Sequence, residues 1–387
     1  MVEKSKVRKV YRRSIEVIKA CSLKNGAIVA SNILDEAYPK DVKSYFYVWP
    51  RDASFVCYAA DLLGMHEIPE RFFEWCWERA ELFREKGVFL AQKYYPHGRA
   101  AGDFDVGIKI SDLKNEKLRR IAKNQMVVRL FYMHFQPDQT ASLLWAIHEH
   151  SKFRKVNKFH DLVKKAANGL CKLWNGKCFR IPSFDLWEEK VADPKLEQVH
   201  TYSLAMCIKG LKSAIELIKP KRKWLNCIEA MEKVLEKCYL SYFVKTYGKK
   251  IDRTIDSSAL GLVWPAEVIE ARDERMVLTV KKILEKNEIN GGILRYPKDK
   301  YDGKISFGKL KLGRAGAWPI LNFWVSIYFS KAGNRKDALK YFNWVLERVK
   351  DKIPEQIKDD KPASVIPLAW GHAMFVIASK FLGFAKI

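Results

Sequence analysis

The sequence of 387 residues contains no long apolar run, and this absence excludes one class of protein. A membrane-spanning helix needs about 18 or more consecutive apolar residues, and no segment approaches that length. The basic, amphipathic segment 1–20 also has no continuous apolar region of the kind that a secretory signal contains. We therefore expect a protein that does not enter a membrane and that works in the cytoplasm.

Motifs for nucleotides and metals are missing as well. The chain has neither the full glycine-rich phosphate loop GxxxxGK[ST] nor the dinucleotide motif GxGxxG, and it has no HExxH pair. His148 and His150 stand two residues apart, so on a helix they would not share a face. An ordinary pair of histidines is therefore favoured over a metal site. We expect no cofactor and no metal.

Cysteine pairs are absent, although the chain has eight cysteines. No two of them form a CxxC motif, and Cys57, Cys76 and Cys207 fall within apolar helical patterns. Buried cysteines of this kind behave as small apolar residues. Free thiols are therefore favoured over a disulfide framework, which is typical of oxidising compartments.

Acidic residues are few beside the basic ones, with 45 against 70 and a net charge of +25. Such an excess raises the question of a polyanionic partner. Basic clusters occur at 219–223, 249–250 and 309–314, but lysine and acid alternate along most of the chain and no nucleic-acid motif is present. A lysine-rich solvated surface is therefore favoured over a surface that binds nucleic acid. A basic helical polyanion-binding protein stays open as an alternative.

Helical periodicity is what the sequence has in abundance. With a helix in segment 1–20, apolar residues at helical spacing predict about a dozen helices. Strand signals are few, and segments 292–296 and 304–307 predict one hairpin around the turn 298–303. No linker or low-complexity tract divides the chain, which predicts a single all-α domain over residues 1–387. The other expected helices are 51–63, 70–84, 138–150, 158–174, 201–218, 223–240, 275–286, 315–330, 335–350 and 366–381.

Aromatic and charged residues crowd into four segments, of which the first is 45–53. Trp49 offers a flat face for stacking, and Arg51 and Asp52 can bind hydroxyl groups through paired hydrogen bonds. This combination suits sugar recognition. The alternative is a helix start with a capping aspartate and a buried tryptophan.

The second segment is 184–189, where Glu188 and Glu189 follow Trp187. Adjacent carboxylates repel, and a carboxylate next to an indole can lose its water, so the pKa of one of them can rise toward the working pH. An enzyme obtains a carboxylic acid that protonates a leaving oxygen in this way. The alternative is a solvated pair at a helix entrance.

The third and fourth segments contribute three more candidates. Segment 291–301 and the residues after it offer Arg295 and Trp318 as binding groups, and the alternative is a surface turn followed by a buried tryptophan. In the fourth segment, Pro354 restricts the backbone just before Glu355. Taken alone, Glu355 is more simply an ordinary loop carboxylate.

Together the four segments resemble glycoside hydrolase family 15, the glucoamylase and glucodextranase family, from about Gly26 to the C-terminus. The order and spacing of the short motifs carry the resemblance. It implies an (α/α)6 toroid, a barrel of six helical hairpins with the active site in the loops at one end. The motifs are YVWPRDA at 47–53, DLWEE at 185–189, RYP at 295–297 with AW at 317–318, and PEQ at 354–356 with LAW at 368–370.

The resemblance also implies roles for individual residues. Glu188 falls at the position of the family's general acid and Glu355 at that of its general base. The implied activity is that of an inverting, exo-acting α-glucosidase, which releases β-glucose from α-glucans, oligosaccharides or disaccharides without a cofactor. A catalytically silent carbohydrate-binding or regulatory homologue is the alternative. The glucose at the non-reducing end would be held by Arg51, Asp52, Glu189 and Arg295, in a pocket lined by Trp187 and Trp318 and supported by Trp49.

The sequence departs from the family pattern in three respects. Ala141 stands where a glycine usually follows the Gln-x-Asp pattern, and Gly371-His372 follows Trp370 in place of a hydroxyl residue. Both bear on the outer sugar subsites rather than on the chemistry. Prokaryotic members usually carry an N-terminal β-sandwich, which we expect to be absent here. A separate partner chain that supplies the β-sandwich, or a homo-oligomer, stays open as an assembly. The linkage cleaved, whether α-1,4, α-1,6 or that of trehalose, stays open.

Overall fold

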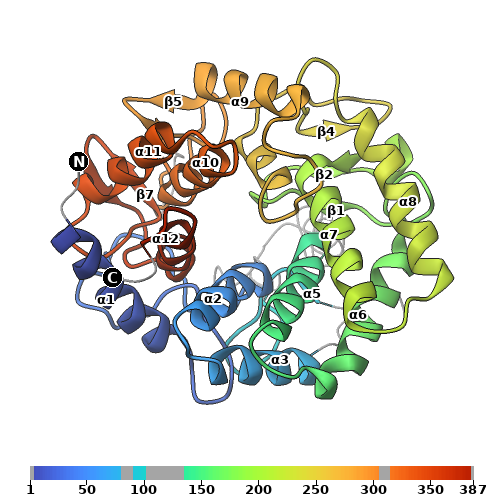
Figure 1. Cartoon of the computed structure of the whole chain (residues 1–387), viewed down its shortest axis with the longest axis horizontal. Coiled ribbons are helices and arrows are strands. Elements are labelled where there is room, and N and C mark those ends of the chain that lie inside the picture. Colours follow the sequence, from blue (N-terminus) through green and yellow to red (C-terminus); the bar gives the residue numbers. More distant parts are fainter. Residues whose placement is uncertain (1–3, 80–89, 102–134, 305–313, 385–387) are drawn as a thin grey trace, which may run out of the picture.

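A computed structural model of the chain describes residues 4–79, 90–101, 135–304 and 314–384. In this part of the chain six elements form an inner ring. Figure 1 shows the ring from one end. Packing runs from α2 to α5, α7, η5, α10 and α12 and then back to α2, so the ring is closed. Its members are α2 (Pro50–Leu62), α5 (Pro137–Ser151), α7 (Thr201–Leu217), the 3-10 helix η5 (Ser257–Leu262), α10 (Pro319–Lys331) and α12 (Ala369–Phe381).

Within the described residues, six further helices form an outer ring and alternate with the inner elements along the chain (Figure 1). Each packs on an inner neighbour: α1 on α12, α3 on α2, α6 on α5 and α7, α8 on α7, α9 on η5, and α11 on α10. This arrangement confirms the expected all-α six-hairpin toroid. The outer helices are α1 (Lys4–Cys21), α3 (Glu67–Arg79), α6 (His160–Leu173), α8 (Arg222–Lys237), α9 (Glu274–Asn287) and α11 (Arg335–Arg348).

The apolar patterns explain which helices lie inside. In α10 every residue from Pro319 to Tyr328 is buried, because the helix packs on neighbours on all sides. In α8 the buried residues recur at a spacing of three or four, as in Trp224 and Ile228, and the other face is charged. Among the described helices, none is long and apolar enough for a membrane span. All eight cysteines are free thiols.

One inner position departs from the expected series of α-helices. Between α8 and α9 the ring is completed by η5, which is only six residues long. Its first turn is capped by the Asp256 carboxylate, which accepts a hydrogen bond of 2.9 Å from the Ser258 N–H. So short an element has no apolar periodicity of its own, and the sequence did not predict it.

Short antiparallel strand pairs occupy the loops. The sequence predicted that 292–296 pairs with 304–307, and this prediction is wrong. Residues 305–307 lie outside the described part of the chain, but the partner of the first segment is clear. Gly292–Ile293 instead pairs with the strand just before it, around a two-residue turn at Asn290 and Gly291, which both have positive φ and suit such a turn. The pairs are β1 (Ser183–Phe184) with β2 (Val191–Ala192), β3 (Val199–His200) with β4 (Thr246–Tyr247), β5 (Glu288–Ile289) with β6 (Gly292–Ile293), and β7 (Gln356–Lys358) with β8 (Lys361–Ala363).

The loops at the two ends of the barrel differ in length. At one end the connections are short, as at 63–66, 218–221 and 332–334. At the other end, where the inner elements begin, the connections are long and contain the four segments that the sequence singled out. These long connections are 22–49, 174–200, 238–256, 288–318 and 349–368.

Candidate active site

The beginnings of the inner elements meet at the end with long loops. The guanidinium of Arg51, in the first turn of α2, has Nη1 3.3 Å from Asp138 Oδ2 at the start of α5. Asp138 Oδ1 accepts a hydrogen bond of 2.7 Å from Ser203 Oγ at the start of α7. The same guanidinium lies 5.3 Å from the ring centroid of Trp370, in the first turn of α12 (Ala369–Phe381). Side chains from three different hairpins therefore hold Arg51 in place.

A second set of contacts adds the remaining two inner elements. The indole Nε1 of Trp187 donates to Asp256, which caps η5, over 2.9 Å. The Trp187 ring lies 5.6 Å from that of Trp318, the residue that caps α10. Helix N-termini carry partial positive charge, so this end of the barrel favours carboxylates and the oxygens of a polar ligand.

Glu188 lies in the turn between β1 and β2. Its backbone is in the left-handed region with φ of 63°, and its N–H donates to the Asp185 carbonyl over 3.0 Å. The carboxylate Oε1 accepts a hydrogen bond of 2.6 Å from Trp49 Nε1. Trp49, which was expected only to support the pocket, thus directly orients the proposed acid.

Buried charges hold this turn from beneath. Asp185 Oδ1 accepts hydrogen bonds of 2.8 and 3.0 Å from the N–H groups of the two residues that follow Glu188. The ammonium of Lys245 lies 2.8 Å from Asp185 Oδ2 and 3.0 Å from Asp256 Oδ2, and Asp256 in turn binds Trp187. Burial disfavours the charged lysine, but the two carboxylates outweigh it and keep the pKa of Lys245 above its usual value. Lys245 thus links Asp185, which holds the turn of Glu188, to Asp256, which binds Trp187.

Arg295 is held in a comparable way on the other side of Trp187. Its Nε and Nη2 lie 2.6 and 2.7 Å from the two oxygens of the buried Asp299. Nη2 also donates to Glu189 Oε1 over 2.8 Å. The guanidinium is 5.4 Å from the Trp187 ring and 5.1 Å from the Trp318 ring. Charge and aromatic faces together leave Arg295 one well-defined position.

Glu355 is buried, with 2% of its surface exposed. Tyr45 donates its hydroxyl to Oε1 over 2.6 Å, and Ser364 donates its hydroxyl to Oε2. Burial raises the pKa of Glu355 above its usual value, while the hydrogen bonds from Ser364 and Tyr45 oppose the rise. A carboxylate whose pKa is shifted toward neutrality is a stronger general base.

Aromatic residues link the two glutamates. Tyr45, bound to Glu355, has its ring 5.4 Å from the ring of Trp49, which binds Glu188. The Tyr301 hydroxyl lies 2.6 Å from that of Tyr45. Burial raises the pKa of Tyr301, and the charges of Glu355 and Glu188 raise it further, so both carboxylates lie within electrostatic reach of this phenol.

The remaining expected residue, Asp52, pairs with Arg51 over 2.9 Å and keeps 13% of its side chain exposed. Burial raises the pKa of Asp52, and the neighbouring guanidinium opposes the rise. The structure thus brings all the residues expected from the sequence into one region: Trp49, Arg51, Asp52, Trp187, Glu188, Glu189, Arg295, Trp318 and Glu355.

Several partners of these residues were not expected from the sequence. Tyr45 and Tyr301 lie inside segments that the sequence singled out, and Asp138 lies in the Gln-x-Asp pattern, so a local signal existed for these three. Asp299 also lies inside the segment 291–301, four residues after Arg295, so a local signal existed for it as well. No local signal marks the others, because their partners are distant in the chain; they are Lys245, Asp256 and Ser364.

One group of side chains in the described ranges has the composition of a metal site: Asp61, His66 and His150. Asp61 Oδ1 lies 2.8 Å from His66 Nδ1 and 2.9 Å from His150 Nδ1, which are hydrogen-bond distances. His148 turns elsewhere, with Nε2 2.7 Å from Glu216. This agrees with the expectation that His148 and His150 do not share a helix face. The group lies where α2 and α5 end, at the opposite end of the barrel from Glu188 and Glu355.

Comparisons with known proteins agree with this geometry. Residues 5–352 match the model of glycosyl hydrolases family 15, a match that ends before Glu355. An uncharacterized glycosyl hydrolase of Methanocaldococcus jannaschii is 30% identical over 405 residues; the alignment covers 97% of this chain but only 56% of that relative.

Solved structures share the fold. A glycosidase in complex with glucose has a TM-score of 0.75 at 19% identity, with 98% of each chain covered. The glucoamylase from Saccharomycopsis fibuligera has a TM-score of 0.69 at 14% identity, with 100% of this chain and 97% of that one covered. A bacterial glucoamylase complexed with acarbose has a TM-score of 0.66 at 19% identity, with 97% and 55% covered. The chain belongs to glycosyl hydrolase family 15.

Proposed function

We propose that this protein is an inverting, exo-acting α-glucosidase with Glu188 as general acid and Glu355 as general base. The observation that carries the proposal is the link between the two carboxylates. They come from separate loops, yet the Tyr45–Trp49 ring pair connects them, and the Tyr301 hydroxyl lies 2.6 Å from the hydroxyl of Tyr45. A pair of carboxyl groups on either side of a bond is the equipment that glycoside hydrolysis needs.

The proposed reaction is a single displacement. Protonated Glu188 donates its proton to the glycosidic oxygen as that oxygen leaves, and positive charge develops on the sugar ring. Ionised Glu355 takes a proton from a water molecule that attacks the anomeric carbon from the opposite face. This role requires the two carboxyl groups to be about 6.5–9.5 Å apart, so that the water fits between Glu355 and the sugar.

The terminal glucose would be held by groups that already have fixed positions. Arg51 is anchored by Asp138, and Arg295 is anchored by Asp299. Glu189 keeps 30% of its side chain exposed, and Asp52 keeps 13%. These carboxylates would accept hydrogen bonds from sugar hydroxyl groups. Such fixed geometry lowers the barrier because little orientational freedom is lost in the transition state.

The substrate class proposed is an α-glucan, an α-linked oligosaccharide or a disaccharide. Glucose and acarbose are bound by two proteins of similar fold, which supports a sugar pocket here. Whether the linkage is α-1,4, α-1,6 or that of trehalose is a matter for a substrate panel. The eight free thiols support action in a reducing compartment such as the cytoplasm.

The test is glucose release from maltose, isomaltose, trehalose and soluble starch, with proton NMR of the first product before the anomers equilibrate. We expect β-glucose to accumulate first from at least one substrate. If α-glucose accumulated first, the reaction would not be inverting, and Glu355 would not be the general base. Release of no glucose from any substrate by a correctly folded protein would instead favour a silent sugar-binding homologue.

The matched variant is Glu188→Gln, which keeps the size of the side chain but cannot donate the proton. We expect turnover to fall by roughly 10²–10⁴-fold while glucose binding persists. If this variant kept nearly full activity on an unactivated disaccharide, Glu188 would not be the general acid and Glu189 would be the next candidate.

A further inference from the structure

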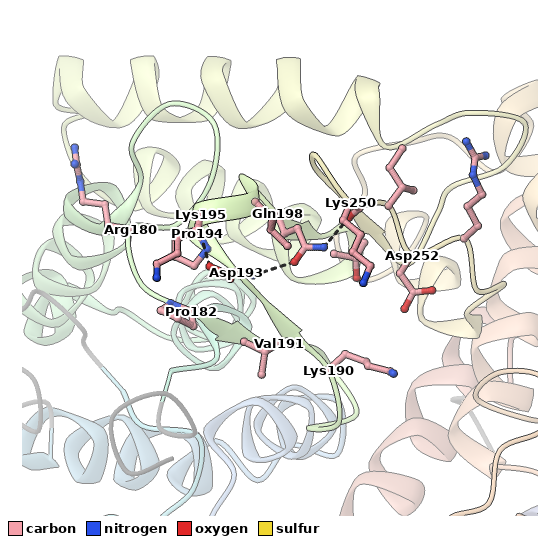
Figure 2. Close-up of a pocket in the computed structure, with 14 residues that line it drawn as sticks. Arg180, Pro182, Lys190, Val191, Asp193, Pro194, Lys195, Gln198, Lys250 and Asp252 are labelled. Carbon is pink, nitrogen blue, oxygen red and sulfur yellow. Dashed lines mark hydrogen bonds between the residues drawn. The ribbon is translucent and has the colours of Figure 1, made fainter. Parts of the chain in front are cut away.

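A hollow of about 950 Å³ lies beside the β1–β2 hairpin (Figure 2). Neither Glu188 nor Glu355 belongs to its lining. Its walls come from the hairpin, from residues 193–198 and from residues 250–253. None of the nine proposed site residues lines it. The hollow nevertheless adjoins the site, because Lys190 in its wall directly follows Glu189.

The lining of this hollow is rich in exposed cations. Lys249–Lys250, one of the basic clusters in the sequence, reaches it through Lys250. Within the described residues, none of the cations of the lining forms an ion pair, whereas the neighbouring Lys249 does so with Glu197. These cations are Arg180, Lys190, Lys195, Lys250 and Arg253.

Two carboxylates in the lining accept hydrogen bonds from nearby backbone N–H groups. Asp193 Oδ1 accepts a hydrogen bond of 2.9 Å from the Lys195 N–H. Asp252 Oδ1 accepts from the Thr254 N–H over 2.9 Å and from the Thr254 hydroxyl over 2.6 Å. Their charge offsets only part of the five cations, and no cation is held in place by them. The side chains of the cations therefore stay available to an anion from solution.

We propose that this hollow binds a small ligand that carries several phosphate groups. The cations come from three separate segments of the chain, an arrangement that suits spaced anionic groups better than a single anion. Arginine offers paired N–H donors that fit phosphate oxygens, and lysine adds point charges. The volume lies in the range of about 300–1,000 Å³ that small-molecule sites occupy.

The phosphate groups can belong to a free oligophosphate or to a phosphorylated sugar. Calorimetric titration of the full chain with tripolyphosphate and with glucose 1,6-bisphosphate, which both carry more than one phosphate group, separates these sources. We expect saturable binding of at least one of them. Preference for tripolyphosphate indicates a free anion, and preference for the sugar phosphate indicates a ligand related to the substrate.

The decisive comparison uses two variants with equal loss of charge. Lys195→Gln/Lys250→Gln/Arg253→Gln removes three cations from the hollow and should weaken binding by about tenfold or more, as expected when charge-assisted hydrogen bonds are lost. Arg8→Gln/Lys9→Gln/Arg12→Gln removes three from a second basic hollow of about 420 Å³ on α1 and should keep the affinity of the unmodified chain.

Three results would overturn the proposal. Equal weakening in both triple variants would mean that overall charge, and not the hollow, attracts the anion. Lack of saturable binding to both ligands would mean that the cations form a solvated surface. Tighter binding of a short single-stranded oligonucleotide through the same three residues would assign the surface to nucleic acid. Because every readout is binding, the outcome does not depend on the proposed glucosidase activity.

Discussion

The two ends of the barrel use buried charge differently. At the end with long loops, Arg51 and Arg295 are each paired with a buried carboxylate and also with a partly exposed one, Asp52 or Glu189. At the opposite end, Asp61 and His150 lie where α2 and α5 end, and they bind each other. At the end with long loops, partly exposed carboxylates can still bind a ligand. At the opposite end, the buried polar groups bind each other.

The difference teaches how one ring can serve both stability and function. A buried charge costs free energy unless it is paired and hydrogen-bonded. At the end with short loops this pairing serves only to join the helices. At the end with long loops the same pairing fixes the direction of groups that remain free to bind a ligand. Substitutions at the end with long loops should therefore lower turnover, and substitutions at the end with short loops should lower the melting temperature.

The largest expected effect is on turnover and belongs to the end with long loops. Glu355→Gln removes the proposed base while keeping its shape, so kcat should fall by roughly 10²–10⁴-fold with little change in the melting temperature. Steady-state kinetics and thermal unfolding on the same sample measure both quantities.

The matched change at the other end is Asp61→Asn. It weakens hydrogen bonds from His66 and His150, so the melting temperature should fall while kcat per folded molecule is unchanged. Loss of turnover in Asp61→Asn, or full activity in Glu355→Gln, would remove the division of roles between the two ends.

The next prediction tests whether buried charges near the site also contribute to the free energy of unfolding. Lys245→Met leaves Asp185 and Asp256 without their shared cation, which should cost about 3–5 kcal/mol of the free energy of unfolding. Denaturant-induced unfolding followed by circular dichroism measures the loss. The control is Lys233→Met, in an exposed pair with Glu229, where we expect an unchanged midpoint. An unchanged midpoint in Lys245→Met would show that this network is dispensable.

A smaller effect belongs to the middle of the ring, between the two ends. A Cβ added at Gly210 in α7 would lie 2.8 Å from the Ala141 carbonyl oxygen and 2.9 Å from its Cα in α5. Gly210→Ala should therefore force the helices apart at a cost of about 1–3 kcal/mol. Ser213→Ala, also buried in α7, adds no atom and serves as the control. Equal midpoints for the two variants in denaturant would mean that the ring adapts easily.

The smallest effect is a shift in pH dependence. Ser364 donates to Glu355 and opposes the rise in its pKa, so Ser364→Ala should raise the pKa of Glu355 further. A general base works only when ionised, and activity is lost as the pH falls through its pKa. The acid limb of the kcat/KM profile should therefore move to higher pH. A move to lower pH would contradict the assignment, and Ser213→Ala should leave the limb in place.

Much of the fold could be predicted because the long helices have strong periodicity. Helix α7 begins at Thr201, as predicted, since its apolar pattern begins there. Helix α10 begins at Pro319 rather than at residue 315, because Trp318 caps it and proline occupies its first position. The element η5 was missed because six residues are too few to show a period.

The candidate site could be predicted as far as its motifs reach. Glu188 and Arg295 stand in motifs that resemble a known family, so a local string was enough to find them. Lys245 was not found, because its two partners lie at 185 and 256 and the contact exists only in the folded chain. Local sequence therefore predicts the groups that would meet the substrate better than the groups that hold them in place.

The left-handed backbone of Glu188 has a consequence for any attempt to make this enzyme more resistant to heat. A residue with a side chain at φ of 63° costs about 1–2 kcal/mol that glycine would not incur. A glycine at position 188 would relax the turn and at the same time remove the proposed acid. Directed evolution that selected only for survival at high temperature would therefore favour the loss of catalysis at this position. An activity screen has to accompany every round of such a selection.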